Sequence, residues 1–140
     1  MTSLPPALAL WRSSIACGLA ALLASAALAQ GVELKDSGTV YHGSSANCSQ
    51  PATINHDKVR DETPEWKTIR SEGVRRGTAR YTLLISEMNA RIQRACRKAA
   101  EEGGRDCVVG HRDIKNDHGL GVVDLTDEVI AKLDASAATA

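Results

Sequence analysis

The sequence predicts an α+β fold, in which a short β-sheet carries a helical hairpin or one long helix and a C-terminal helix. Three observations lead to this class. A capped, amphipathic helical pattern occupies residues 64–102, and a second capped helix follows at 126–133. Short apolar runs at 52–56, 107–109 and 122–125 have the length of strands. The predicted order is therefore strand, helices, strand, strand and helix.

The first 29 residues, which precede these elements, have the layout of a secretory signal peptide. Arg12 precedes an uncharged apolar run over residues 15–29, which ends in Ala-Leu-Ala before Gln30. The run is about 15 residues long, whereas a membrane-spanning helix needs about 20. We therefore expect cleavage near Gln30, export to the periplasm and no membrane span. The alternatives are an uncleaved N-terminal anchor and a lipoprotein attached through Cys17.

Composition limits the function of the exported chain. Removal of residues 1–29 from the 140-residue chain leaves 111 residues, enough for one small domain with a modest core. Without Arg12, the 17 basic side chains become 16, against 17 acidic ones. The remaining aromatic residues are Trp66, Tyr41 and Tyr81. Because the chain lacks both a basic excess and a stacking platform, we expect no nucleic-acid partner.

The chain between the signal peptide and the first strand is rich in Gly, Ser and Asn. For residues 30–51 we therefore expect a mobile N-terminal segment with at most one marginal strand. The single α+β domain then covers residues 52–134. Its first strand is expected at 52–56, with Val59 as an extension. The small residues 135–140 predict a disordered tail.

The helical region is divided by glycines. Residues 63–65, Thr-Pro-Glu, predict a helix start, because threonine caps free amides, proline suits the first position and glutamate favours the positive end of the dipole. Gly73 and Gly77 each cost a helix about 1 kcal/mol relative to alanine. We therefore expect a break there, with Thr78 as a fresh cap.

After Thr78, one apolar stripe recurs at spacings of three and four residues, which predicts an amphipathic helix that ends at Gly103-Gly104. We expect this stripe to be a packing surface rather than a cofactor site, and we expect no cofactor. The stripe consists of Tyr81, Leu84, Ile85, Met88, Ile92, Ala95, Cys96 and Ala99.

The remainder of the domain alternates short strands with turns. Residues 107–109 predict a buried strand, residues 111–121 a polar loop, and residues 122–125 a second strand. Thr126 is expected to cap the final helix, which has Asp127 in its first turn.

Charge is unevenly distributed along the chain. Residues 64–102 hold nine Lys or Arg and five Glu, whereas residues 30–63 and 105–134 are net acidic. One interpretation is an ordinary solvated helix face. The other is a positive surface that attracts acidic partners or anionic lipid headgroups. The candidate binding residues of this basic face are Arg75, Arg76, Arg80, Arg91, Arg94, Arg97 and Lys98.

His111, Asp113, Asp117 and His118 form the richest cluster of metal ligands in the sequence. Imidazole and carboxylate suit zinc or a similar divalent ion. The other interpretation is a solvated loop rich in turn formers. A G-x-S-x-G motif and a phosphate-binding loop do not occur, so the sequence does not indicate an enzyme.

Three cysteines follow the signal peptide: Cys48, Cys96 and Cys107. In an oxidising compartment one pair can form a disulfide, which leaves the third thiol free or intermolecular. Cys96 and Cys107 enclose the shortest loop, but spacing does not decide the pairing. These two are otherwise interpreted as small buried hydrophobes.

Two segments of the C-terminal half resemble the Skp/OmpH family of periplasmic chaperones. One comprises residues 91–103 with 106–109, and the other, residues 122–133, contains the step Asp-Leu-Thr-Asp-Glu into a terminal helix. The earlier segments 54–59 and 63–66 look like that family's first strand and helix entry. The resemblance implies a periplasmic trimer whose basic helical arms hold unfolded outer-membrane proteins.

The main hypothesis is therefore an exported, non-enzymatic protein that binds unfolded or other envelope proteins through its basic helical region. Residues 64–102 agree with the family's arms in charge, but these arms are much longer coiled coils. Contact of the basic face with a membrane surface is a further interpretation. The alternative function is a metal- or thiol-dependent envelope protein that uses the loop between His111 and His118 or a free cysteine.

Overall fold

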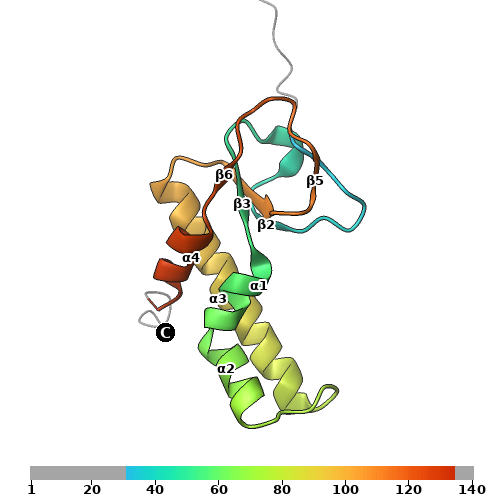
Figure 1. Cartoon of the computed structure of the whole chain (residues 1–140), viewed down its shortest axis with the longest axis vertical. Coiled ribbons are helices and arrows are strands. Elements are labelled where there is room, and N and C mark those ends of the chain that lie inside the picture. The colour runs from blue at the N-terminus through green and yellow to red at the C-terminus, as the bar shows by residue number, and fades with distance from the viewer. Residues whose placement is uncertain (1–30, 135–140) are drawn as a thin grey trace, which may run out of the picture.

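The structure, a computed structural model, describes residues 31–134. The predicted signal peptide (1–29), Gln30 and the predicted tail (135–140) lie outside the described residues. The fold is α+β, as predicted, with strands at one end and a helical hairpin that extends to the other (Figure 1). The elements in chain order are β1 (Glu33–Leu34), β2 (Val40–His42), η1 (Ser45–Asn47), β3 (Pro51–Ile54), α1 (His56–Glu62), α2 (Pro64–Ser71), α3 (Ala79–Glu102), β4 (Cys107–Gly110), β5 (Ile114–Asn116), β6 (Val123–Asp124) and α4 (Thr126–Leu133).

The main sheet has the strand order β2-β4-β3-β6. Strand β3 is parallel to both β4 and β6, whereas β2 is antiparallel to β4. A parallel pair requires a long crossover, and helices α1, α2 and α3 supply it between β3 and β4. Because Ile54 pairs with Gly110, these two strands end at the same level. The segments that follow them therefore begin at the same edge of the sheet.

The sheet separates two apolar clusters of unequal size. Successive strand residues point to opposite faces, so Val108 of β4 joins the large core under the helices, whereas Cys107 joins a small cluster with Val32 and Cys48. The stripe of α3 is buried from Met88 onwards and partly exposed nearer the hairpin turn. The buried members of the large core are Ala52, Ile54, Val59, Met88, Ile92, Ala95, Cys96, Ala99, Ala100, Val108, Leu125, Val129 and Leu133.

Both predicted helix starts in the hairpin are confirmed. The Thr63 side chain accepts a hydrogen bond from the backbone N–H of Trp66 at the start of α2. The Thr78 side chain does the same for Tyr81 at the start of α3. Each cap satisfies an amide that the first helical turn leaves without a partner.

The break between α2 and α3 is also confirmed. Gly73 has a φ of 61°, a left-handed conformation that glycine adopts without steric cost. The N–H of Val74 then donates a hydrogen bond to the carbonyl of Ile69, five positions earlier, at 3.0 Å. This hydrogen bond is characteristic of the Schellman motif at a helix C-terminus. The chain reverses here, so α2 packs against α3 as a hairpin.

The expectation of at most one marginal strand within residues 30–51 was wrong, because the described residues 31–51 contain two strands, β1 and β2, and the short helix η1 ahead of β3. Strand β2 pairs with β4, and β1 pairs with β5, which lies inside the predicted loop at 111–121. Strands of two or three residues carry no periodic pattern of their own. Their partners, distant in sequence, define them.

Two element boundaries differ from the prediction near the edge of the sheet. The strand predicted at 52–56 ends before Asn55, whose side chain caps α1, so Val59 is a buried helical residue. Thr126 is the first residue of α4 rather than its cap. Its backbone N–H donates to the carboxylate of Asp124 instead.

Candidate functional site

Arg75, Arg76 and Arg80, three of the seven basic candidates, gather at the turn between α2 and α3. All three are exposed. Arg80 forms an ion pair with Glu72 across the turn. Because both side chains of that pair are about half exposed, water screens it.

Arg91 does not belong to an exposed surface. Its guanidinium donates to both carboxylate oxygens of Glu65, with a shortest distance of 2.7 Å, and to the carbonyl of Leu133 at 3.2 Å. The exposed fractions of the Arg91 and Glu65 side chains are 14% and 8%. The hydrogen bonds that Arg91 donates to Glu65 raise the pKa of Arg91 against the effect of burial. This arginine therefore ties α3 to α2 and α4.

The other basic candidates lie on α3 towards the sheet. Exposed Arg94 and Arg97 line a shallow hollow with Tyr41 and His42 of β2, and Lys98 is half-buried. The seven candidates therefore fall into an exposed group at the tip, the largely buried Arg91, the pair Arg94 and Arg97 beside β2, and the half-buried Lys98. A single continuous basic face does not describe them.

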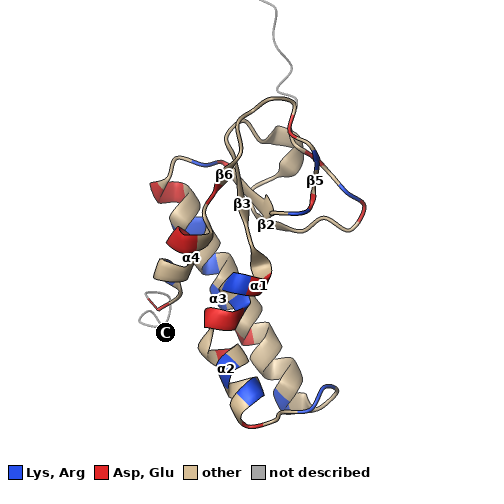
Figure 2. Ribbon diagram, viewed as in Figure 1, with Lys and Arg blue, Asp and Glu red and all other residues tan. Residues whose placement is uncertain are grey.

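The tip carries the strongest charge bias of the described chain. Residues 67–84 hold five Lys or Arg and one acid, Glu72. The rest of the described chain, residues 31–66 and 85–134, holds 11 basic and 16 acidic residues. Figure 2 shows basic segments at the turn of the hairpin. We call residues 67–84 the basic tip.

The basic tip also carries an apolar group that the sequence analysis did not select. Leu83 is 58% exposed, the highest value among the large hydrophobic residues described. It lies on α3 outside the buried stripe, next to Leu84. Exposed Arg70 on α2 was missed as well. A count of charge in a window of 18 residues would have found the tip, but the exposure of Leu83 required the packing of the hairpin.

The four predicted metal ligands are not gathered into one site. His111 and Asp113 line a pocket at the carboxyl ends of β3 and β4, whereas His118 lines a different hollow beside Val32. Within residues 31–134, no three of these four side chains bring their ligand atoms within 4.8 Å of one another. The four residues therefore do not form one cluster of ligands in the described structure.

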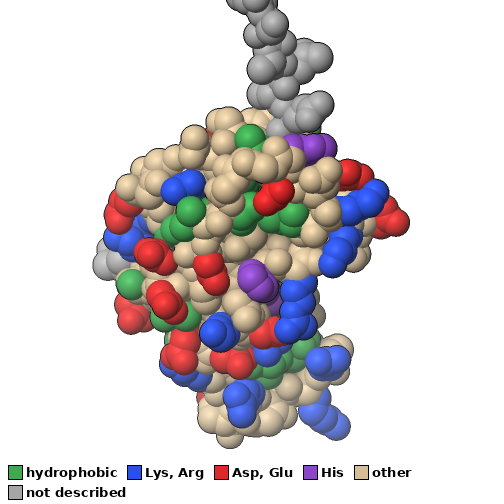
Figure 3. Space-filling view, turned by 45° about the horizontal axis from the view of Figure 1, so that its top comes forward, with side chains coloured by type: hydrophobic (Ala, Val, Ile, Leu, Met, Phe, Trp, Pro, Cys, Tyr) green, Lys and Arg blue, Asp and Glu red, His purple; other side chains and the backbone are tan. Residues whose placement is uncertain are grey.

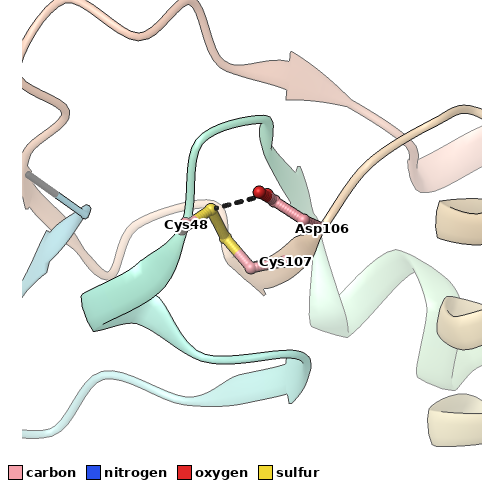
Figure 4. Close-up of side chains that lie close together, drawn as sticks. All are labelled: Cys48, Asp106 and Cys107. Carbon is pink, nitrogen blue, oxygen red and sulfur yellow. Dashed lines mark hydrogen bonds between the residues drawn. A yellow bond between two sulfur atoms is a disulfide. The ribbon is translucent and has the colours of Figure 1, made fainter. Parts of the chain in front are cut away.

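Cys48 and Cys107 form a disulfide, with Cα atoms 5.7 Å apart (Figure 4). An oxygen of Asp106 lies 3.3 Å from the Cys48 sulfur. A disulfide sulfur has no proton to donate, so this is a close contact rather than a hydrogen bond. These three residues have the spacing of metal ligands, but bonded sulfurs cannot act as thiolates.

Asp106 fixes the loop that follows the disulfide. Its carboxylate accepts hydrogen bonds from the N–H and hydroxyl of Ser49 and from the N–H of Gln50, at 2.6 to 2.8 Å. Burial opposes the charge, but the bonds from Ser49 and Gln50 outweigh it and lower the pKa of Asp106. This arrangement is structural: it orders the chain between the disulfide and β3.

The third cysteine is enclosed in the large core. Cys96 on α3 is fully buried and free. Burial raises the pKa of its thiol to about 12. A thiol that stays protonated is neither a good nucleophile nor a metal ligand. The alternative function through a free, reactive cysteine therefore has no support from this residue.

Comparison with family models, with curated proteins and with solved structures found no match to this chain. The resemblance to the Skp/OmpH family therefore stays a prediction from the sequence. Among residues 31–134, no helix has both the length and the apolar character needed to cross a membrane.

Proposed function

We propose that this is an exported, non-enzymatic binding protein of the periplasm, which holds acidic segments of unfolded or other envelope proteins at its basic tip. The observation that carries the proposal is the combination of five basic residues, one acid and an exposed Leu83 within residues 67–84. Basic side chains provide attraction at a distance, and an apolar side chain provides contact area once the partner has arrived.

Charge complementarity favours an acidic partner. Arg75 and Arg76 have no ion pair with any described residue, so both guanidinium groups are available. Arginine binds carboxylates through two parallel hydrogen bonds, which adds geometric selectivity to the attraction. Exposed ion pairs contribute about 0–1 kcal/mol each. Several must therefore act together, and binding is expected to be salt-sensitive.

Local contacts order the two helices that carry the tip. Helices α2 and α3 are capped by Thr63 and Thr78, and the buried pair of Glu65 and Arg91 joins them. A preorganised surface loses less conformational entropy when it binds. A membrane surface is the less favoured partner, because one exposed leucine offers little apolar area for insertion.

The trimer implied by the family resemblance is part of this proposal. The family's long arms differ from this hairpin, whose longer helix has 24 residues and therefore a length of about 36 Å. Light scattering of the purified protein, with and without reductant, measures the assembly. If the protein proved to be a monomer, several arms could not hold one client together, but binding at the tip of a single chain would still be expected.

The test measures suppression of aggregation of an acidic, urea-unfolded outer-membrane β-barrel protein on dilution. The protein is compared with the triple variant R75S/R76S/L83S at about 50 and 300 mM NaCl. The proposal predicts suppression that weakens at the higher salt concentration. It also predicts that the variant suppresses aggregation much less at the lower one.

The double variant R94S/R97S is the matched control, because it removes two exposed arginines from the same helix. Its activity is expected to stay close to that of the unmodified protein. Equal losses in both variants would assign binding to the whole of α3 rather than to the tip. Unchanged suppression in both variants, or suppression independent of salt, would overturn the proposal. Equal co-sedimentation of both variants with anionic vesicles would exclude a specific membrane role for the tip.

A further inference from the structure

A pocket of about 250 Å³ lies at the edge of the sheet where β3 and β4 end. Ligand sites in sheets with parallel strands occur preferentially at the carboxyl ends of the strands. The pocket is lined by residues that follow these two strands and by Tyr41 of β2. The residues that follow the strands are His56 and Lys58 from α1, and His111 and Arg112 after β4. In Figure 3, histidine, basic and acidic side chains lie close together near the centre of the visible face.

The carboxylates around this pocket already have partners. Asp57 and Asp61 both accept hydrogen bonds from the guanidinium of Arg60, each with an ion-pair distance of 2.9 Å. Asp113 accepts a hydrogen bond from the N–H of Thr39 at 2.9 Å. These acids are therefore engaged in holding the walls of the pocket.

The wall formed by Asp113 depends on a glycine. A Cβ atom at Gly110 would lie 2.1 Å from the Asp113 carboxylate, so only glycine leaves room for this aspartate beside the end of β4. The N–H of Asp113 also donates to the carbonyl of Gly110 at 3.0 Å. The turn that carries His111 and Arg112 is therefore closed on itself and fixed to β2 through Thr39.

Two cationic side chains that line the pocket, those of Lys58 and Arg112, are not held in this way, although the charge of Lys58 acts on the nearby carboxylate of Asp124. Neither the Lys58 nor the Arg112 side chain has an ion pair or a hydrogen bond with another residue of the described chain, whereas the backbone carbonyl of Arg112 accepts a hydrogen bond from Lys35 at 2.6 Å. His56 stacks on Tyr41, with ring centroids 5.8 Å apart, and its buried Nδ1 has no hydrogen-bond partner among the described residues. Polar atoms that are buried without a partner are uncommon in folded proteins, and this one lies on a residue of the pocket.

We propose that this pocket binds a small carboxylate ligand, which the Arg112 guanidinium and the Lys58 ammonium group hold, with the Tyr41–His56 stack as its apolar wall. The volume is slightly below the range of about 300–1,000 Å³ that is usual for small-molecule sites, which indicates a compact ligand. This site is independent of the basic tip, because the tip lies at the far end of the hairpin.

Charge selects a carboxylate over phosphate. Two cationic side chains, Lys58 and Arg112, line the pocket together with the carboxylates of Asp57, Asp61 and Asp113. Arg60, which is paired with two of these acids, and Asp124 lie nearby. The surroundings of a bound anion are thus slightly negative overall. A singly charged carboxylate that contacts two cations is favoured there, whereas a second negative charge adds repulsion from the aspartates. The second carboxylate oxygen of Asp113, which has no hydrogen-bond partner among residues 31–134, also suits the ammonium group of an amino acid.

The test is an NMR titration of the four histidine side chains with acetate, glycine and inorganic phosphate, each at constant ionic strength. The proposal predicts saturable shifts of His56 and His111 with acetate or glycine, and weaker effects of phosphate. His42 and His118 lie outside the pocket and are expected to stay unchanged. Tighter binding of glycine than of acetate would identify an amino acid as the ligand class, and the reverse a simple acid.

The variant K58Q/R112Q should weaken binding by about tenfold or more, since it removes both charge-assisted contacts. Both residues are exposed, so the histidine spectrum without ligand should be retained, which checks the fold. The control R75Q/R76Q removes the same charge at the tip and should bind normally. Linear, unsaturable shifts, equal weakening in both variants, preference for phosphate, or shifts centred on His42 would each overturn the proposal.

Discussion

The two ends of this molecule achieve their structure in different ways. The sheet end consists of strands with two to four residues and is fastened by the disulfide between Cys48 and Cys107. The hairpin end has a helix of 24 residues, two threonine caps and a buried ion pair. The two ends also differ in net charge, because the excess of basic residues is confined to the tip of the hairpin (Figure 2).

The two ends are stabilised by different interactions, and these interactions are distinct from the exposed charges of the two candidate sites. Short strands offer few ladder hydrogen bonds and little local preference, so a covalent link between distant segments contributes most at that end. Helices are defined locally, so their end needs only packing and caps. The exposed charges on both proposed sites contribute little to folding.

Loss of the disulfide should cause the largest change in stability. The bond joins residues 59 positions apart, and a closed loop of that size stabilises a fold by about 4 kcal/mol in the chain-entropy model. We therefore expect the variant C48A/C107A to lose about 2–5 kcal/mol in urea unfolding. Cys96 should stay unreactive towards thiol reagents until the chain unfolds, because burial raises its pKa to about 12. A loss below 1 kcal/mol would show that the sheet end is held by packing alone.

Removal of the buried ion pair at the hairpin should have the next largest effect. The variant E65A leaves the guanidinium of Arg91 without its main partner, at a site where both side chains are almost buried. Breaking such a pair costs about 3 kcal/mol or more. The matched control is E62A, which breaks the exposed pair between Glu62 and Lys67 and should cost less than about 1 kcal/mol. Similar losses in the two variants would contradict the difference between buried and exposed pairs.

A helix cap at the hairpin should give the smallest of these changes. The variant T78A removes the side chain that accepts from the N–H of Tyr81, and we expect a loss of about 1 kcal/mol in thermal or urea unfolding. T82A, one turn further along α3, leaves the cap in place and should change stability by about 0.5 kcal/mol at most. If T82A proved as destabilising as T78A, the contribution of the cap would be refuted.

The candidate sites were only partly predictable. The sequence identified the tip arginines Arg75, Arg76 and Arg80 by their charge. Their exposure was also predictable, because a glycine-flanked turn between two helices lies at the surface. Arg91 belonged to the same charge pattern, but its role depends on Glu65, which is 26 residues away and buried with it. Helical periodicity places Arg91 on one face of α3 and says nothing about which helix packs there.

The cysteines and the His/Asp loop show the same limit. Loop length pointed to Cys96 and Cys107 as the nearest pair, whereas the fold joins Cys107 to Cys48. His111 and Asp113 come together with His56 and Lys58 only because β3 and β4 end in register. No local signal connects these two segments, since three helices separate them in the chain.

The sequence by itself determined the class of fold, the helices α2, α3 and α4, the caps at Thr63 and Thr78 and the break at Gly73, because these helices and their ends depend on residues within one or two turns of each other. It also located the excess of positive charge. The tertiary structure alone decided the pairing of β1 with β5, the disulfide, the contact of Arg91 with Glu65 and the pocket beyond β3 and β4. Each of these depends on contacts between segments distant in the chain, and such contacts are selected by the packing of the whole domain rather than by local preference.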